Sequence, residues 1–318
     1  MWHGCCFHWG TMRITSDMNM RMMSSMLRTH QQSQYDTRLQ MSSGRKVNLA
    51  SDDPGAYEAI RNLTSDLSQL EQFQRNMNMA THYLSMADQG IERSYNILHQ
   101  VNELAVQASD GTVDPGTLQN MAEQANQLLE SMIGAANSSE GGRYTFAGLR
   151  TDVRPYEAQV DANGLITGVT YVGSEETRRI QMGPDQFAET NIAGSSPAGE
   201  GGIFQTATRD VFDSIIRLRD ALLAGENPAN TDIGEQLEAD LGHMLNQASL
   251  NGARHEQVTL QKSYVSDMQL THMQSLESLQ SVDMAEAAMR LSQSETAYQA
   301  ALYSSSNLMK QATLLNYI

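Results

Sequence analysis

An apolar repeat from residue 56 to residue 108 constrains the fold most strongly. Apolar side chains recur every seven residues, and a second set follows each by three, which is the spacing of coiled-coil seams. Over eight heptads only Asp66 and Ser94 break the pattern, and no proline falls between 55 and 114. The repeat predicts one helix, about 80 Å long, that packs lengthwise on partner helices. Its expected seam residues include Leu63, Leu70, Met77, Leu84, Ile91 and Leu98.

Aspartate–proline pairs mark two predicted helix starts. Ser51-Asp52-Asp53-Pro54 places a capping aspartate directly before a proline at the first helical position. Asp114-Pro115 repeats the device and opens a second helix, which runs to about residue 136. Between them, Ser109-Asp110-Gly111 predicts the end of the long helix, because glycine can adopt the left-handed capping conformation.

The C-terminal third is also predicted to be helical. A helix is expected over 207–224, with Phe212, Ile215, Ile216, Leu222 and Leu223 facing inward. A long helical region follows from about 232, and its apolar pattern stays weak until a heptad returns near the end of the chain. The seam residues expected there are Met284, Leu291, Tyr298, Leu308 and Leu315.

Residues 143–205 have a different composition, rich in β-branched and aromatic residues. Tyr144-Thr145-Phe146 and Ile166 to Val172 predict strands, and Asp161-Ala162-Asn163-Gly164 is typical of a hairpin turn. A further short strand is expected near Arg178 to Met182, and 194–202 is expected to be a loop.

Together these patterns predict a mainly α fold, an elongated rod of long antiparallel helices from both chain ends with a small β-containing domain inserted in the middle. The expected domains are terminal helices at 12–50 and 280–318, a helical rod at 51–142 and 206–279, and a β-rich outer domain at 143–205. The terminal helices lack a third packing partner within the chain. Because most helix stability comes from packing, we expect them to become ordered on self-association.

Residues 1–11 differ in composition from the rest of the chain. They contain both cysteines, Cys5 and Cys6, and both tryptophans. The adjacent cysteines do not match the spacing of structural zinc sites. We therefore expect Met12 to be the natural start and residues 1–11 to be a non-native or wrongly assigned extension.

Composition and motifs argue against several classes of function. The net charge of −16 disfavours nucleic-acid binding, and no apolar run is long enough to insert in a membrane. His255-Glu256 begins a zinc-protease-like string, but Thr259 occupies the place of its second histidine. The sequence thus predicts no enzyme, no cofactor and no metal site.

Two stretches resemble the terminal signatures of bacterial flagellins and hook-associated proteins. The first is Arg38 to Asn48 followed by Ser-Asp-Asp-Pro, and the second runs from Asp283 to Ala300. Gly142 to Gly148 and the ending Leu314 to Ile318 favour the members of the family that form the hook–filament junction. The signature positions are Ser43, Gly44, Asn48, Asp52, Asp53, Pro54, Ala285, Glu286, Ser292, Glu295, Tyr298 and Gln299.

The resemblance implies a structural subunit of the bacterial flagellum. Such a subunit forms a ring of identical copies between a neighbouring hook-associated protein and flagellin. It leaves the cell through the flagellar type III system without a cleaved signal peptide, after an export chaperone has held its C-terminal helix. Two alternatives remain, a short flagellin that builds the filament and a cytosolic coiled-coil scaffold.

Overall fold

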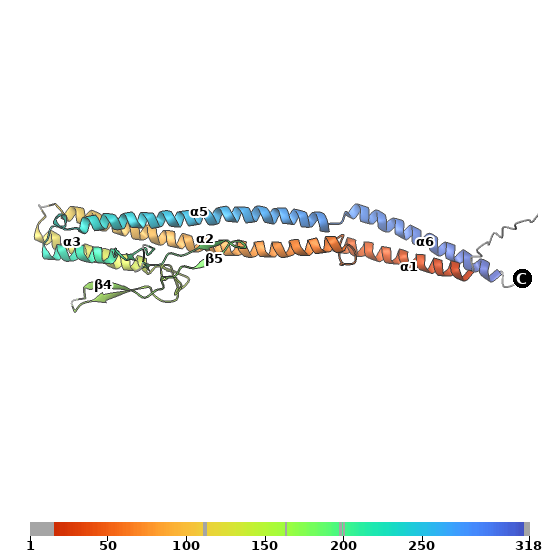
Figure 1. The fold of residues 1–318 in the computed structure, drawn as a ribbon, viewed down its shortest axis with the longest axis horizontal. Helices are drawn as coiled ribbons and strands as arrows, with labels where there is room; N and C mark the ends of the chain where they lie inside the picture. The colour runs from red at the N-terminus through yellow and green to blue at the C-terminus, as the bar shows by residue number, and fades with distance from the viewer. Residues whose placement is uncertain (1–15, 111–112, 163, 197–198, 200, 315–318) are drawn as a thin grey trace, which may run out of the picture. The chain divides into compact units, whose positions relative to one another are not determined.

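A computed structural model of the protein describes residues 16–110, 113–162, 164–196, 199 and 201–314. The chain forms two compact units: unit 1 comprises Met1–Leu67 and Leu270–Ile318, and unit 2 comprises Ser68–Gln269. The predicted mainly α fold is confirmed, with helices from the two chain ends side by side and short strands in the middle of the sequence (Figure 1). The extension at 1–11 lies outside the described residues.

Six α-helices make up most of the described chain. They are α1 (Ser16–Ser43), α2 (Pro54–Ala108), α3 (Pro115–Ala136), α4 (Val211–Ala224), α5 (Ile233–Gln280) and α6 (Met284–Leu314), with one short 3-10 helix at Pro228–Asn230. The two predicted capping aspartates are confirmed. Asp53 Oδ1 accepts a hydrogen bond from the Ala56 amide at 2.9 Å, and Asp114 accepts from the amides of Gly116 and Thr117. Gly111, the predicted cap at the end of α2, lies outside the described residues.

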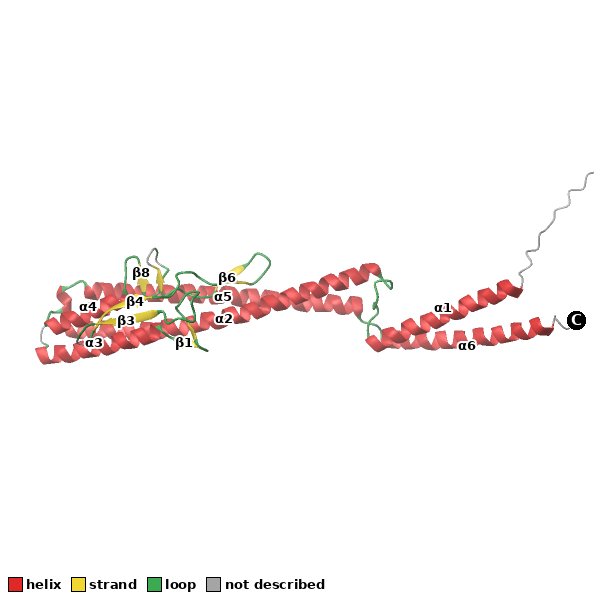
Figure 2. Ribbon diagram, turned by 90° about the horizontal axis from the view of Figure 1, so that it is seen from below, coloured by secondary structure: helices red, strands yellow, loops and turns green. Residues whose placement is uncertain are grey.

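The strands form four separate two-stranded sheets (Figure 2). Three are antiparallel: β1 (Ser139–Glu140) with β2 (Arg143–Tyr144), β3 (Tyr156–Val160) with β4 (Ile166–Tyr171), and β5 (Arg179–Gln181) with β6 (Phe187–Glu189). The fourth pairs β7 (Ser195–Ser196) with β8 (Gln205–Thr206) in parallel.

The hairpin turn at 161–164 was predicted correctly, but the partner strand was not. β4 pairs with 156–160, whereas Phe146 of the predicted strand 144–146 lies outside any strand and is fully buried. Residues 195–196 of the predicted loop form β7.

The core of unit 2 lies between α2, α3, α4, α5 and the β3–β4 hairpin. Its aromatic centre is Tyr156, whose ring centroid lies 5.0 Å from that of Phe212 and 5.5 Å from that of Phe204. Along α4 the predicted inward residues are buried except Leu223, which is 48% exposed. It follows Leu222 by about 100° around the helix and so leaves the apolar face.

The weak apolar pattern of α5 has a structural cause. Its buried residues keep the alternating four- and three-residue spacing of a seam from Ile233 to Asn251, but three of these positions are polar: Asp240, Gln247 and Asn251. Asn251 Nδ2 donates to the Leu84 carbonyl of α2 at 3.0 Å, and Asp240 accepts from Ser214 Oγ at 2.7 Å. Polar seam residues of this kind fix the register of paired helices.

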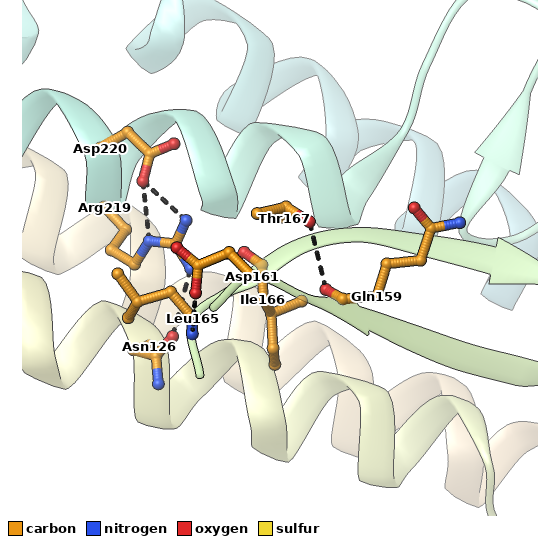
Figure 3. Close-up of polar contacts among 8 residues, drawn as sticks. All are labelled: Asn126, Gln159, Asp161, Leu165, Ile166, Thr167, Arg219 and Asp220. Carbon is orange, nitrogen blue, oxygen red and sulfur yellow. Dashed lines mark hydrogen bonds and ion pairs between the residues drawn. The ribbon is translucent and has the colours of Figure 1, made fainter. Parts of the chain in front are cut away.

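A buried arginine joins the β3–β4 hairpin to the helices (Figure 3). Arg219 of α4 is 2% exposed and donates to the Ile166 carbonyl at 2.7 Å and to Asn126 Oδ1 at 3.3 Å. Its charge is balanced by Asp220, which accepts from Nε and Nη2 at 2.8 and 2.6 Å. One side chain therefore holds the start of β4 against α3 and α4.

Gly90 of α2 is required by the close approach of Phe146. A Cβ at Gly90 would lie 2.6 Å from Phe146 Cζ, whereas nothing lies within 4 Å of a Cβ at Gly134 in α3. We expect Gly90→Ala to lower the free energy of unfolding by about 1–3 kcal/mol through overpacking. Gly134→Ala should raise it by about 0.5–1 kcal/mol, because alanine is the better helix former. Urea denaturation of both variants checks the pair, and equal effects would contradict this packing.

Asp240 predicts a specific pH dependence of stability. Burial raises its pKa, and hydrogen bonding from Ser214 and the charges of Arg209 and His243 only partly oppose this, while Asp210 adds to it. The folded chain therefore binds a proton at Asp240 more tightly than the unfolded chain does. As a result, the free energy of unfolding falls as the pH rises from the unfolded pKa of about 3.9 through the raised folded pKa.

We therefore expect Asp240→Asn to be more stable than the wild type at neutral pH. The difference should vanish below the unfolded pKa, where Asp240 is neutral in both states. Thermal melting across this pH range is the measurement, with the exposed Asp185→Asn as control. A wild type that is more stable than the variant at neutral pH would refute the argument.

Candidate assembly surface

The candidate site is the antiparallel pair of α1 and α6 in unit 1 (Figures 1 and 2). Their facing positions are less exposed than the rest of each helix and follow the alternating spacing of a two-helix seam. On α1 they are Met23, Leu27, His30, Gln34, Thr37 and Met41, and on α6 they are Ala287, Leu291, Ser294, Tyr298, Ala301 and Ser305. Of the seam residues expected for the C-terminal helix, Leu291 and Tyr298 lie on this face.

Polar contacts define the register of this pair. Gln31 Nε2 donates to Tyr298 Oη at 2.9 Å, and Gln34 Nε2 donates to the Ser294 carbonyl at 3.2 Å. Arg38 and Glu295 form an ion pair at 2.9 Å, with side chains 60% and 46% exposed. Exposed pairs of this kind contribute about 0.2–1 kcal/mol, so the contacts align the helices but stabilise them little.

The described part of unit 1 buries very little apolar surface. Among its described hydrophobic residues only Val47 and Ala287 are buried, and both apolar core clusters of the chain lie in unit 2. Half of its described large apolar side chains are exposed: Met18, Met20, Met22, Met26, Tyr35, Leu49, Tyr57, Leu270, Met273, Met284, Met289, Leu302 and Tyr303. Covering a Met or Leu side chain is worth about 1.5–3 kcal/mol, so α1 and α6 present an apolar surface suited to other chains.

The N-terminal signature residues build the turn between α1 and α2. Gly44 has a φ of +68°, the left-handed conformation that ends α1, and its carbonyl accepts from the Val282 amide at 3.2 Å. Asp52 Oδ2 accepts from the amides of Asn48 and Leu49 at 3.0 and 2.9 Å. Ser43 Oγ accepts from the Arg45 amide, and Pro54 is the first residue of α2. The signature therefore holds the connection between two helices in place.

The C-terminal signature begins α6 and contributes to the seam. Asp283 Oδ1 accepts from the amides of Ala285 and Glu286 at 2.8 and 3.1 Å, which caps the helix. Glu295 and Tyr298 contact α1 as described, whereas the side chains of Ser292 and Gln299 are exposed.

The structure separates the predicted seam residues into two groups. Leu70, Met77, Leu84, Ile91 and Leu98 are buried in unit 2, so they serve internal packing and are not available to another chain. Leu63 and Leu291 are half-buried in unit 1, and Met284 is 49% exposed and lies outside the α1–α6 seam. The Leu308 side chain and Leu315 lie outside what the structure describes.

Sequence reasoning missed the α1 side of this site. Gln31 and Gln34 are ordinary polar helix residues, and nothing local in the sequence indicates that they contact residues more than 250 positions away. Met23, Leu27 and Met41 are apolar residues at heptad spacing and were the one available signal. The seam positions between Leu27 and Met41 are polar (His30, Gln34 and Thr37), so the repeat is hard to recognise.

The described residues offer no alternative site with obvious chemistry. Within the described ranges, no group of three or more His, Cys, Asp or Glu side chains could hold a metal ion. None of the described helices is long and apolar enough to cross a bilayer.

Comparison with known proteins shows that the N-terminal part of the chain is similar to bacterial flagellins. Residues 14–151 match the family model of the bacterial flagellin N-terminal helical region, which confirms the resemblance predicted from the terminal signatures. Over these residues the chain is similar to the N-terminal helical region of bacterial flagellins.

Individual relatives give a more specific likeness. The chain is 28% identical over 144 residues to Flagellar hook-associated protein 3 of Escherichia coli (strain K12), covering 45% of this chain and 43% of that protein. It is 25% identical over 139 residues to Polar flagellin C of Vibrio parahaemolyticus, covering 43% and 36%. The chain thus spans about two fifths of the length of these curated relatives. None of these names denotes an enzyme, in agreement with the prediction of a non-catalytic protein.

A solved structure shows the same fold. The flagellar junction protein FlgL from Legionella pneumophila matches with a TM-score of 0.56 and 16% identity, over 70% of this chain and 99% of that one.

The small buried core of unit 1 predicts unequal resistance to protease in the isolated chain. Arg28, Arg38, Arg290 and Arg93 all have exposed side chains on helices, but only Arg93 belongs to unit 2. We expect trypsin to cleave after the first three at least about tenfold faster than after Arg93, because helices with few buried contacts open more readily. The earliest stable fragment should contain residues 68–269. Equal cleavage rates at all four sites would show that unit 1 is stable alone.

Proposed function

We propose that this chain is a structural subunit of the bacterial flagellum at the junction between hook and filament. The observation that carries the proposal is the apolar surface of the α1–α6 pair, which one chain leaves exposed. The match to the flagellin N-terminal region and the fold shared with a flagellar junction protein supply the flagellar setting.

The proposed mechanism is mechanical. Copies of the chain associate head to tail into a ring, and neighbouring α1–α6 pairs cover the apolar side chains that each leaves exposed. Head-to-tail contacts are not self-complementary, so the two faces of the ring differ. One face then contacts a hook-side junction protein, and the other is the surface on which flagellin assembles.

Export and location follow from the same proposal. The subunit travels unfolded through the flagellar type III system, without a cleaved signal peptide, and functions outside the cell. A cytoplasmic chaperone holds the C-terminal segment, about residues 280–318, before export. The exposed apolar residues of α6, such as Met289, Leu302 and Tyr303, support a segment that needs covering until it is assembled.

One alternative has a specific observation in its favour. The match to Polar flagellin C is similar in length and identity to the match to hook-associated protein 3, so a short filament subunit is the second candidate. A cytosolic coiled-coil scaffold is the third, and the exposed apolar surface of unit 1 does not favour it.

Deletion of the gene separates these functions. A junction subunit predicts immotile cells that release flagellin monomers into the medium, because export continues while filament attachment fails. Immotile cells without flagellin inside or outside would identify the chain as the filament subunit. Motile cells would contradict both flagellar functions.

Substitutions on the exposed face test the surface itself. We expect Met22→Asp to block incorporation, because an unpaired carboxylate buried between subunits costs about 3 kcal/mol or more. Met79 of unit 2 is similarly exposed, so Met79→Asp is the matched control and should be tolerated. Complementation of the deletion strain and a swimming assay provide the measurement, with immunoblots to confirm export of both variants. Normal motility with Met22→Asp would place the assembly surface elsewhere.

A further inference from the structure

The described methionines of the two units differ in exposure. In unit 2, Met77, Met132, Met182 and Met244 are at most 1% exposed, Met86, Met121 and Met268 are half-buried, and Met79 is 50% exposed. In unit 1, nine methionines have described side chains, and seven of these are more than 40% exposed: Met18, Met20, Met22, Met26, Met273, Met284 and Met289. Four of these seven lie within nine residues of α1.

Exposure decides how readily a methionine is oxidised. Hydrogen peroxide transfers one oxygen atom to the thioether sulfur, so the peroxide O–O bond breaks, an S=O bond forms and water is released. The sulfur loses two electrons and the peroxide gains them. The product, methionine sulfoxide, is polar, whereas the thioether is apolar and adapts to irregular surfaces.

We propose that Met18, Met20, Met22 and Met26 form an oxidation site that controls assembly of the subunit. This inference rests on the proposed function, because it takes the exposed face of α1 to be covered by neighbouring subunits. Peroxide oxidises these four side chains in the free subunit, and the sulfoxides then oppose the packing that assembly requires. Burying a sulfoxide oxygen without a hydrogen-bond donor is unfavourable.

The position of the four methionines on α1 limits their oxidation to the time before assembly. Met18, Met22 and Met26 follow one another at four-residue intervals, so they lie along neighbouring positions of one helix side, and Met20 lies on the other side of the α1–α6 seam. Once neighbours cover these sulfur atoms, peroxide no longer reaches them. The assembled subunit is therefore protected, and oxidation acts on chains not yet incorporated.

The modification is reversible by a known class of reaction. Methionine sulfoxide reductases remove the oxygen as water while two thiols form a disulfide, with one enzyme for each sulfoxide epimer. Oxidised subunits can thus regain their apolar surface.

The first experiment maps oxidation in the purified full-length chain. Dilute hydrogen peroxide is applied, and peptide mass spectrometry follows the gain of one oxygen at each methionine. We expect the four α1 methionines to react at least about tenfold faster than Met77, Met132, Met182 and Met244. Equal rates, or loss of unit 2 structure by far-ultraviolet circular dichroism, would overturn the assignment.

The second experiment tests the consequence for assembly. The purified chain is mixed with hook particles isolated from a strain lacking the gene, and co-sedimentation is measured before and after peroxide. We expect oxidation to lower co-sedimentation of the wild type at least about fivefold, and the two reductases to restore it. Undiminished co-sedimentation of the oxidised chain would refute the control of assembly.

Variants locate the effect within the chain. Each is compared with its own untreated sample. A variant with all four α1 methionines replaced by leucine should lose less than about twofold on peroxide treatment, since leucine has no sulfur to oxidise. Met79→Leu, the control in unit 2, should remain as sensitive as the wild type. Equal sensitivity of the fourfold variant would exclude these residues as the oxidation site.

The two proposals fail in distinguishable ways. If the untreated wild type does not bind hook particles at all, the proposed function is wrong, and the control of assembly is wrong with it. If the untreated wild type binds and the oxidised chain binds equally well, the proposed function stands and only the oxidation control is wrong.

Discussion

The structure depends on the pairing of α1 with α6 through a seam that is only partly apolar. His30, Gln34 and Thr37 occupy central positions of that seam on α1, and Ser294 and Tyr298 lie across from them. Hydrogen bonds and one exposed ion pair set the register but bury little apolar surface. Many large apolar side chains of both helices, such as Met22 and Met289, are exposed. We propose that a pair built in this way is aligned for assembly and gains most of its stability when other chains cover it.

Unit 2, in contrast to unit 1, buries a large apolar core. Leu84, Ile91 and Leu98 of α2 are at most 1% exposed, and they belong to continuous apolar clusters with residues of the other helices. Arg219 holds the β3–β4 hairpin to α3 and α4 through backbone and side-chain acceptors. Unit 2 therefore has the buried core expected of a part that folds within one chain. Its polar seam residues, such as Asn251, fix the register of the paired helices. An apolar residue at the same position would contribute packing but would not select one register.

Local signals in the sequence were sufficient to predict much of the fold. Aspartate–proline pairs located the starts of α2 and α3, and the heptad repeat identified the buried face of α2. Contacts between distant segments were not predictable in this way. Nothing near Gly90 indicates that Phe146 packs against it, and nothing near Arg219 indicates that it bonds to Ile166. The α5 seam was obscured because Asp240 and Gln247 occupy positions at which a repeat search expects apolar residues.

Sequence patterns located the helix seams but did not show which seams a single chain completes. Leu291 and Tyr298 of the expected C-terminal seam lie on the face of α6 that packs on α1, whereas Met284 is exposed. Five expected seam residues of α2, from Leu70 to Leu98, pack within this chain. A heptad pattern alone could not show this, because it does not distinguish a partner helix in the same chain from one in another chain.

The central claim is that α1 and α6 are completed by neighbouring subunits, and amide hydrogen exchange tests it most directly. Exchange is compared between the free chain and the same chain within isolated flagella. The account predicts that protection of α1 and α6 increases strongly on assembly, while protection of the α2 residues between Met77 and Leu98 changes little. Strong protection of α1 and α6 already in the free chain, or weak protection in both states, would contradict it.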